Sequence, residues 1–270
     1  MTLLLHLSDP HFGTEQPQVV AALVALVRAR RPDLLVLSGD ITQRARPPQF
    51  AAARRFCQDL GIARMLALPG NHDIPLFDLA GRVLRPYANY LEAFGPRLDP
   101  VLEADADLLV GVNTTRPTRH KDGEVSPAQV ARVAHQLRAA RAGVLRIVVT
   151  HQPAEVLRPE DRHDRLHGAE AALQAWSAAG ADLVLGGHIH LPYVMDLVKR
   201  PTPTPRPMWC VQAGTAVSAR VRHGTSNSVN LIGWTPPRPG EARQCTLERC
   251  DYDAATGAFA SAETRVLPLA

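Results

Sequence analysis

Short apolar runs alternate with longer amphipathic stretches through the first two thirds of the chain. Runs such as Leu3–Leu7 and Leu34–Ser38 predict strands, the second of them fully buried. Stretches such as Gln16–Arg30 and Gln49–Leu60 carry apolar residues at helical spacing. The expected elements that follow are Arg64–Leu68, Ile74–Phe94 (mostly helix, broken near Pro86), Leu108–Val112, Pro127–Arg141, Leu145–Thr150, Ala169–Ala179 and Leu183–Gly186. This β-α-β-α order predicts α/β layers with a mostly buried central sheet.

The pattern changes after Gly187, where expected strands follow one another without intervening helices. These strands are Tyr193–Val198, Met208–Ala213, Ser228–Trp234 and Gln244–Tyr252, and proline-rich segments at 201–207 and 236–239 separate them. We expect residues 1–270 to form a single domain. In it, a mainly β part, 191–270, completes a second, largely antiparallel sheet beside the βα-alternating part, 1–190. The proline-rich composition of residues 201–207 does not indicate a role for this loop.

The composition is that of an ordinary globular chain, with 46% hydrophobic and 21% charged residues. The net charge of +4 permits an anionic partner without requiring one. No run approaches the ~18 to 20 apolar residues of a membrane span, and Met1–Leu7 has no basic region typical of a signal peptide. The four cysteines form no CxxC pair. We therefore expect a cytoplasmic chain with reduced thiols and no membrane span.

Eleven histidines are the unusual feature of the composition, and several of them follow expected strands. Together with nearby carboxylates and one amide they form a set of metal-competent side chains, namely Asp9, His11, Asp40, Asn71, His151, His188 and His190. The carboxyl ends of strands are where ligands bind in open α/β sheets. If these strands share one sheet, the side chains converge although they span about 180 positions.

The ligand types in this set suit divalent ions such as Mn, Fe, Zn or Co, because they are carboxylates and imidazoles without a thiolate. Seven ligands are too many for one ion but suffice for two ions that share a bridging carboxylate. Two ions ~3.5–4 Å apart can hold a hydroxide and clamp both oxygens of an in-line phosphoryl displacement. The predicted cofactor is therefore a pair of divalent metal ions, and the predicted chemistry is attack of a metal-bridging hydroxide on phosphorus.

The motifs D-x-H, G-D, G-N-H-D, a lone His and G-H-x-H stand in this order at expected strand ends. This order resembles the calcineurin-like metallophosphoesterase family over roughly residues 3–235, and within it the class III cyclic-nucleotide and glycerophosphodiester phosphodiesterase branch. The resemblance implies a two-sheet β-sandwich flanked by helices, the αββα arrangement. It also implies that Asp9, His11 and His190 hold a first metal. Asn71, His151 and His188 would hold a second metal, and Asp40 would bridge the two.

The resemblance assigns two further roles within the G-N-H-D motif. His72 would lie near the leaving-group oxygen, as a general acid or as a cation that stabilises developing charge. Asp73 would orient His72. Asn113 and Arg116 follow an expected strand and are weaker candidates for contacts to phosphate or leaving group.

The predicted activity is hydrolysis of small phosphodiesters, of the cyclic-nucleotide or glycerophosphodiester type. Two alternatives on the same fold stay open: a nuclease or DNA-repair phosphoesterase, and a phosphomonoesterase. A non-catalytic binding module is the alternative from another class. The expected partner is a phosphate-ester small molecule; nucleic acid is not favoured, and a homodimer is compatible with the sequence.

Overall fold

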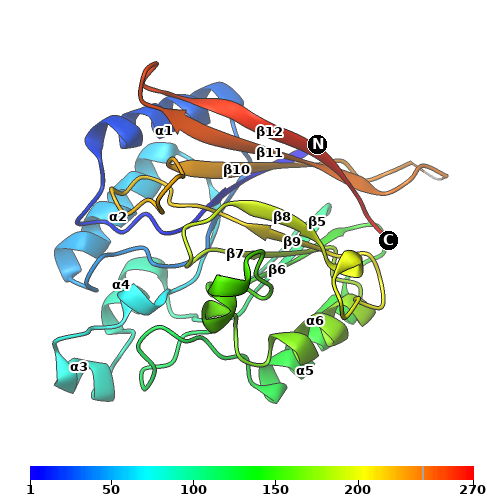
Figure 1. Ribbon diagram of the computed structural model, residues 1–270, viewed down its shortest axis with the longest axis horizontal. Coiled ribbons are helices and arrows are strands. Elements are labelled where there is room, and N and C mark those ends of the chain that lie inside the picture. The colour runs from blue at the N-terminus through cyan, green and yellow to red at the C-terminus, as the bar shows by residue number, and fades with distance from the viewer. Residues whose placement is uncertain (239) are drawn as a thin grey trace.

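The computed structural model describes residues 1–238 and 240–270, so Pro239, the last residue of the second proline-rich segment, lies outside the described residues. Within these residues two six-stranded sheets pack face to face, and helices cover their outer faces (Figure 1). The expected α/β class with two sheets flanked by helices is thereby confirmed.

The first sheet has the strand order β12-β11-β10-β1-β2-β3. Its strands are β1 (Thr2–Leu7), β2 (Leu34–Leu37), β3 (Arg64–Ala67), β10 (Ser228–Trp234), β11 (Gln244–Asp253) and β12 (Ala258–Pro268). β1, β2 and β3 run parallel, while β10, β11 and β12 pair antiparallel. Helices α1 (Pro17–Arg30) and α2 (Pro47–Leu60) make the crossovers between the parallel strands.

The second sheet has the strand order β4-β5-β6-β7-β9-β8. Its strands are β4 (Val101–Glu103), β5 (Asp107–Gly111), β6 (Leu145–Val149), β7 (Leu183–Gly186), β8 (Tyr193–Asp196) and β9 (Trp209–Gln212). The four central strands are parallel, and β4 and β8 are antiparallel edges. Helices α5 (Pro127–Ala139) and α6 (Ala169–Ala178) cover this sheet.

The central strands are continuously apolar because both of their faces are buried. In β2, Leu35 and Leu37 pack toward α1 and α2, whereas Leu34 and Val36 pack between the two sheets. β7 repeats the alternation, with Val184 facing the helices and its leucines facing the other sheet. A strand with one face in water would alternate apolar and polar residues. The apolar runs of the sequence therefore report a four-layer arrangement.

We expected the strands of the C-terminal part to complete the second sheet, but the structure divides them between the two sheets. β8 and β9 do join the second sheet, and β9 is parallel to β7. β10, β11 and β12 instead extend the first sheet, because β10 pairs antiparallel with the otherwise open edge of β1. The condition that all the ligand-bearing strands share one sheet does not hold either. β1, β2 and β3 lie in one sheet, and β6 and β7 lie in the other.

Smaller differences lie in the connections. The expected helix over Ile74–Phe94 is two short helices, α3 (Leu79–Leu84) and α4 (Ala88–Phe94), and α3 begins only after its cap Asp78. The short 3₁₀ helices η1 (Asn71–Asp73), η2 (Pro159–Asp164) and η3 (Leu197–Lys199) were not expected, nor were strands β4 and β12. Among the described residues no helix has the length and apolar character needed to cross a membrane.

Candidate metal centre and its cavity

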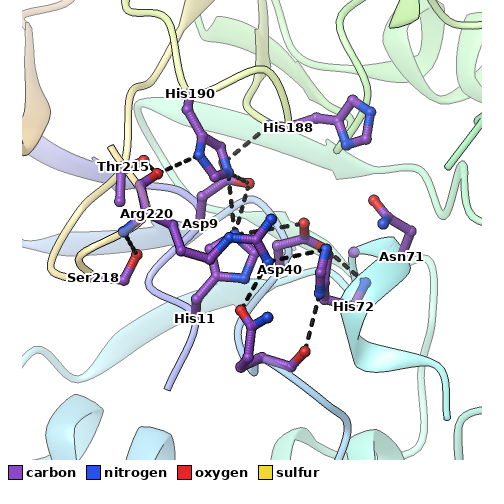
Figure 2. Close-up of polar contacts among 12 residues, drawn as sticks. Asp9, His11, Asp40, Asn71, His72, His188, His190, Thr215, Ser218 and Arg220 are labelled. Atoms are coloured by element: carbon purple, nitrogen blue, oxygen red, sulfur yellow. Dashed lines mark hydrogen bonds and ion pairs between the residues drawn. The ribbon is translucent and has the colours of Figure 1, made fainter. Parts of the chain in front are cut away.

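The seven metal-competent side chains converge on one side of the sandwich, where the carboxyl ends of strands from both sheets meet. Asp9 and His11 follow β1, Asp40 follows β2, and Asn71 opens η1 after β3. His151 follows β6, and His188 and His190 follow β7. All except His190 and His188 are buried, with Asp9, His11 and His151 fully so. Figure 2 shows Asp9, His11 and His190 gathered beside Asp40, with Asn71 and His188 farther to the right.

Two glycines allow the edges of the two sheets to approach closely at this point. A Cβ on Gly39, which has a φ of +107°, would lie 2.4 Å from Nδ1 of His151. A Cβ on Gly187 would lie 1.8 Å from the hydroxyl oxygen of Ser8. Across the same junction the Nδ1–H of His151 donates to the carbonyl of Ser38 at 2.9 Å. Because neither position carries a side chain, the two sheet edges can approach closely enough for their ligands to share one centre.

The first candidate group consists of Asp9, His11 and His190. Nε2 of His190 lies 3.3 Å from Oδ1 of Asp9 and 3.1 Å from Nε2 of His11. Nε2 of His11 lies 3.8 Å from the same carboxylate oxygen. Ligand atoms about 2.1 Å from a single ion are about 3.0 to 3.4 Å apart. The two distances from His190 fall in this range, and the longer separation of His11 and Asp9 corresponds to a wider angle at a single cation.

The second candidate group lies around His151 and shares Asp40 with the first. Nε2 of His151 is 3.2 Å from Oδ1 of Asp40 and 3.3 Å from Oδ1 of Asn71. Asp40, His151 and His188 offer ligand atoms within 4.8 Å of one another. The other oxygen of Asp40, Oδ2, lies 3.8 Å from Nε2 of His11. One oxygen of Asp40 thus faces each group, which is the geometry of a bridging carboxylate.

The hydrogen bonds of the imidazoles leave their ligand nitrogens free. Carbonyl oxygens only accept, so Nδ1 must be the donor where His151 contacts Ser38 and where His190 contacts Arg220. In both rings Nε2 then faces a carboxylate and is the nitrogen that a metal ion would bind. Within the described chain, the buried Oδ1 of Asp9 and Nδ1 of His188 have no hydrogen-bond partner. Buried polar atoms of this kind are rare unless something else binds them, so the residues fit a pair of cations.

The charges of the site are strongly coupled. Burial opposes ionisation of the two carboxyl groups, but the facing imidazoles outweigh it and hold the pKa of Asp9 and of Asp40 below the usual range. Burial lowers the pKa of His11 to about 3. It also opposes a charge on His151, yet Asp40 and Asp9 raise the pKa of that imidazole to about 9. A cation bound beside these carboxylates would displace this proton, which makes metal binding pH-dependent.

The backbone at the ligands is strained. The non-glycine residues Asp9, His11, Asp40, His188 and His190 all have φ between 42° and 74°. Left-handed conformations of this kind carry a free-energy cost for side chains other than glycine and cluster at functional sites. The left-handed conformation turns each ligand-bearing segment sharply after its strand and directs the side chain into the centre.

His72 belongs to neither of the two groups described above, although His11, Asp40 and His72 also offer ligand atoms within 4.8 Å of one another. Its backbone N–H donates to Oδ1 of Asp40 at 2.8 Å, and its Nδ1–H donates to the carbonyl of Gln43 at 3.0 Å. The carbonyl fixes the tautomer, so Nε2 faces the cavity. Nε2 can then donate a hydrogen bond only when the imidazole is protonated.

The Asp73 carboxylate accepts hydrogen bonds from the loop after β2 and from Gly70 rather than from the ring of His72. We expected its carboxylate to orient His72, but the Gln43 carbonyl holds that ring. The Asp73 carboxylate accepts hydrogen bonds from the backbone of Ile41 at 2.9 Å and of Thr42 at 2.8 Å. It also accepts one from Gly70. Burial raises the pKa of Asp73 to about 6, with a contribution from Asp40. Asp73 therefore ties the loop after β2 to the loop after β3 and positions His72 through the backbone.

A family model for calcineurin-like phosphoesterases matches residues 2–192. The chain belongs to the calcineurin-like phosphoesterase family. The matched range contains all seven metal-competent residues as well as His72 and Asp73. Members of this family use divalent metal ions, which agrees with the candidate metal groups of this structure.

Two similar proteins are named as phosphodiesterases. The glycerophosphodiester phosphodiesterase GpdQ of Enterobacter lignolyticus is 38% identical over a segment that covers 26% of this chain and 29% of the relative. A probable cyclic nucleotide phosphodiesterase of Synechococcus sp. is also 38% identical, over 23% of this chain and 25% of the relative. The matched segments span less than a third of either relative.

Solved structures share the fold at low sequence identity. The purple acid phosphatase of yellow lupin seeds has a TM-score of 0.71 at 11% identity, covering 99% of this chain and 53% of that one. A dimetal phosphatase of Danio rerio has a TM-score of 0.62 at 11% identity, covering 100% and 99%. Vacuolar Protein Sorting 29 of Cryptosporidium parvum has a TM-score of 0.52 at 11% identity, covering 99% and 98%. At these identities the likeness shows the calcineurin-like fold alone.

The centre of this calcineurin-like phosphoesterase opens into a cavity of about 390 Å³. Four of the candidate ligands and His72 line it, together with residues that were not predicted from the sequence, among them Lys121, Asp161, Asp164, Arg220 and Arg222. Asp164 on η2 lies 3.6 Å from Nε2 of His188 and 3.2 Å from Nζ of Lys121. No motif marks these residues, because the loops that carry them meet the centre only in the folded chain.

Asn113 and Arg116 are not among the residues that line this cavity. The Asn113 side chain accepts hydrogen bonds from the backbone N–H and the hydroxyl of Thr115, at 3.0 and 2.7 Å. The Arg116 guanidinium donates to the carbonyl of Thr115 at 2.9 Å and to the Gln129 side chain at 2.9 Å. Local contacts therefore occupy both side chains, and their role in substrate binding stays a prediction.

Proposed function

We propose that the chain is a dinuclear metal-dependent phosphodiesterase that hydrolyses small phosphodiesters of the cyclic-nucleotide or glycerophosphodiester type. The observation that carries the proposal is the position of Asp40. Its two carboxylate oxygens face Nε2 of His151 at 3.2 Å and Nε2 of His11 at 3.8 Å. One carboxylate between two groups of imidazole ligands is what a pair of divalent ions needs.

Asp9, His11 and His190 would hold one ion, Asn71, His151 and His188 the other, and Asp40 both. Two bound divalent ions would supply a water-derived nucleophile at neutral pH and neutralise charge on the phosphoryl oxygens. His72 directs Nε2 into the cavity from a ring fixed by the Gln43 carbonyl. As an imidazolium it donates a hydrogen bond to a phosphate or leaving-group oxygen, and it can release its proton to the departing alkoxide.

The size and charge of the cavity support a small anionic substrate. A volume of about 390 Å³ lies within the range of small-molecule sites. Lys121, Arg220 and Arg222 supply positive charge at its walls, although Asp161 and Asp164 offset part of it. The names of the relatives, a glycerophosphodiester phosphodiesterase and a probable cyclic nucleotide phosphodiesterase, support the same substrate class.

A substrate panel with metal analysis tests the proposal. The protein is loaded with Mn²⁺ and offered cyclic nucleotides, glycerophosphodiesters, phosphomonoesters, single-stranded DNA and bis(p-nitrophenyl) phosphate. We expect two metal ions per chain and faster turnover of the small diesters than of the monoesters or the DNA. The Asp40→Ala variant, which lacks the proposed bridging carboxylate, is the negative control.

Other outcomes of the same panel point to the alternatives. Preferred hydrolysis of single-stranded DNA, with an affinity that falls steeply with salt, would indicate a nuclease. Preferred hydrolysis of monoesters would indicate a phosphatase. A folded protein that binds two metal ions but hydrolyses none of the substrates would overturn the enzyme proposal in favour of a binding module. The cytoplasmic location and the homodimer stay predictions.

A further inference from the structure

Arg220 differs from the other cations of the cavity because no carboxylate of the described residues pairs with it. Lys121 lies 3.2 Å from Asp164, and Arg222 lies 2.9 Å from Asp161. In the described chain the guanidinium of Arg220 contacts no carboxylate, and its partners are Oε1 of Gln43 at 2.9 Å and Nε2 of His72 at 3.4 Å. Arg220 is half-buried and lines the cavity together with Asp40 and His72. Its charge is therefore available to an anion in the cavity.

The backbone of Arg220 is fixed independently of its side chain. The residue lies in the loop between β9 and β10, and its carbonyl accepts hydrogen bonds from Nδ1 of His190 and from the hydroxyl of Thr215. Its N–H donates to the hydroxyl of Ser218 at 3.3 Å. Figure 2 shows the side chain extending from this loop toward His72. A substitution of the side chain thus keeps the backbone contact to His190.

The positions of the two nitrogens suit a single oxygen acceptor. Nη1 of Arg220 and Nε2 of His72 are 3.4 Å apart. An oxygen about 2.8 to 2.9 Å from both nitrogens is geometrically allowed, and a guanidinium donates strongly to phosphate oxygens. Gln43 holds both partners, through its carbonyl to His72 and through its side-chain oxygen to Arg220. The two groups are therefore positioned together by one residue.

We propose that Arg220 binds a non-bridging phosphate oxygen of the substrate, an oxygen that it shares with His72. This proposal rests on the proposed phosphodiesterase function and names the residue that recognises the phosphate group. Gln43 is the positioning residue for the guanidinium. The recognised chemistry is the phosphoryl group itself, so the contribution of Arg220 is the same for every ester that the site accepts.

The test uses Arg220→Met, Arg220→Lys and the matched control Arg54→Met, whose arginine is exposed on α2. Binding of inorganic phosphate to the Mn²⁺-loaded proteins is measured by calorimetry, and metal content is measured in parallel. We expect Arg220→Met to keep two metal ions and to bind phosphate about 10- to 100-fold more weakly. Arg220→Lys should recover part of this loss, and Arg54→Met should bind phosphate like the original chain.

Kinetics on two diesters complete the test. Since a non-bridging oxygen is present in both, Arg220→Met should reduce kcat/KM by similar factors for bis(p-nitrophenyl) phosphate and for a diester with an alkyl leaving group. A loss confined to the alkyl diester would overturn the assignment to a non-bridging oxygen. Unchanged phosphate affinity with only a lower unfolding temperature would show that Arg220 is structural. If the original chain hydrolyses no ester and binds no phosphate, the proposed function itself fails.

Discussion

Asp40 is the residue on which both candidate metal groups depend. It is almost fully buried, and the imidazoles of His151, His72 and His11 outweigh the effect of burial and hold its pKa well below the usual range. Besides facing both groups, its Oδ1 accepts the backbone N–H of His72 at 2.8 Å. A single side chain thus links metal binding to the position of the proposed catalytic imidazole.

We therefore expect Asp40→Ala to lose metal ions and activity together. Loss of an outer contact to a metal ligand lowers metal affinity roughly 10- to 100-fold, and loss of a shared ligand should exceed this. Metal content after dialysis and turnover of bis(p-nitrophenyl) phosphate measure the two effects. The control Asp59→Ala removes an exposed carboxylate on α2 and should change neither. A variant at Asp40 that retains two ions would contradict the bridging role.

His72→Ala should separate metal binding from turnover. The imidazole lies outside the second group, so we expect both ions to remain while kcat falls about 10²- to 10⁴-fold. The measurement compares metal content with kcat on a diester that has a poor leaving group, where stabilisation of the departing oxygen matters most. Full turnover of that diester by the variant would show that the assigned role is wrong.

At the scale of elements, the centre depends on how tightly the strand ends of the two sheets approach each other. Gly187 follows β7 and faces the segment after β1. A Cβ there would lie 1.8 Å from Oγ of Ser8 and 2.4 Å from Oδ2 of Asp9. Oδ2 of Asp9 also accepts the backbone N–H of His188 at 2.9 Å. A methyl group at this point has to push the sheets apart.

Gly187→Ala should therefore lower both stability and metal affinity. Overpacking of this kind reduces the free energy of unfolding by about 1 to 3 kcal/mol. The control Gly61→Ala substitutes a glycine that has open space around it and a φ of +68°. This control should lose stability through backbone strain alone and keep its metal ions. Equal metal affinity in the two variants would contradict the packing argument.

The loop after β6 is joined to α6 and to the residue after η3 by an ion-pair cluster. Arg200, only 4% exposed in its side chain, lies 2.6 Å from Glu155 and 2.5 Å from Glu170. Burial opposes the charge of Glu170, but hydrogen bonds from Arg200 and Arg165 outweigh it and lower its pKa from 4.5 to about 2. Because the folded pKa is depressed, the stabilisation is present above about pH 5 and is lost as the pH falls toward 2.

Glu170→Gln should accordingly lower the free energy of unfolding at pH 6 by on the order of 1 kcal/mol, since the side chain is 44% exposed and screened by solvent. The difference from the original chain should shrink as the pH falls from 5 toward 2. Urea unfolding of both proteins at several pH values measures it. A difference that stays constant or grows at acidic pH would contradict the assigned pKa shift.

At the scale of the whole molecule, the proposed metal pair should link folding to metal concentration. The ligands come from strands of both sheets, and their convergence needs the folded chain. An ion that binds only the folded state at 100 times its dissociation constant adds about 2.7 kcal/mol per site. Two occupied sites would therefore raise the unfolding temperature by several degrees.

Removal of metal with a chelator should lower the unfolding temperature and abolish hydrolysis, and added Mn²⁺ should restore both. Differential scanning calorimetry at graded Mn²⁺ concentrations provides the measurement. The Asp40→Ala protein should show little dependence on Mn²⁺, because its shared ligand is missing. An unfolding temperature that does not respond to metal in the original chain would contradict the proposed centre.

The sequence alone determined the layers and the members of the candidate centre. Apolar runs such as Leu34–Ser38 predict strands buried on both faces, because this pattern is visible in residues that are neighbours along the chain. The ligand residues follow strands closely along the chain, so the sequence already places them at the carboxyl ends of strands. The family motifs lie in the same segments.

Only the tertiary structure decided how the strands are distributed and which loops complete the cavity. β10 joins β1 in the first sheet while β9 joins β7 in the second. The pairing of β1 with β10 spans more than 220 positions and has no local signal. The same holds for Arg220 and Asp164, whose loops reach the centre through long-range contacts. Periodicity reports whether a face is buried, but the partner that buries it is chosen by packing of the whole chain.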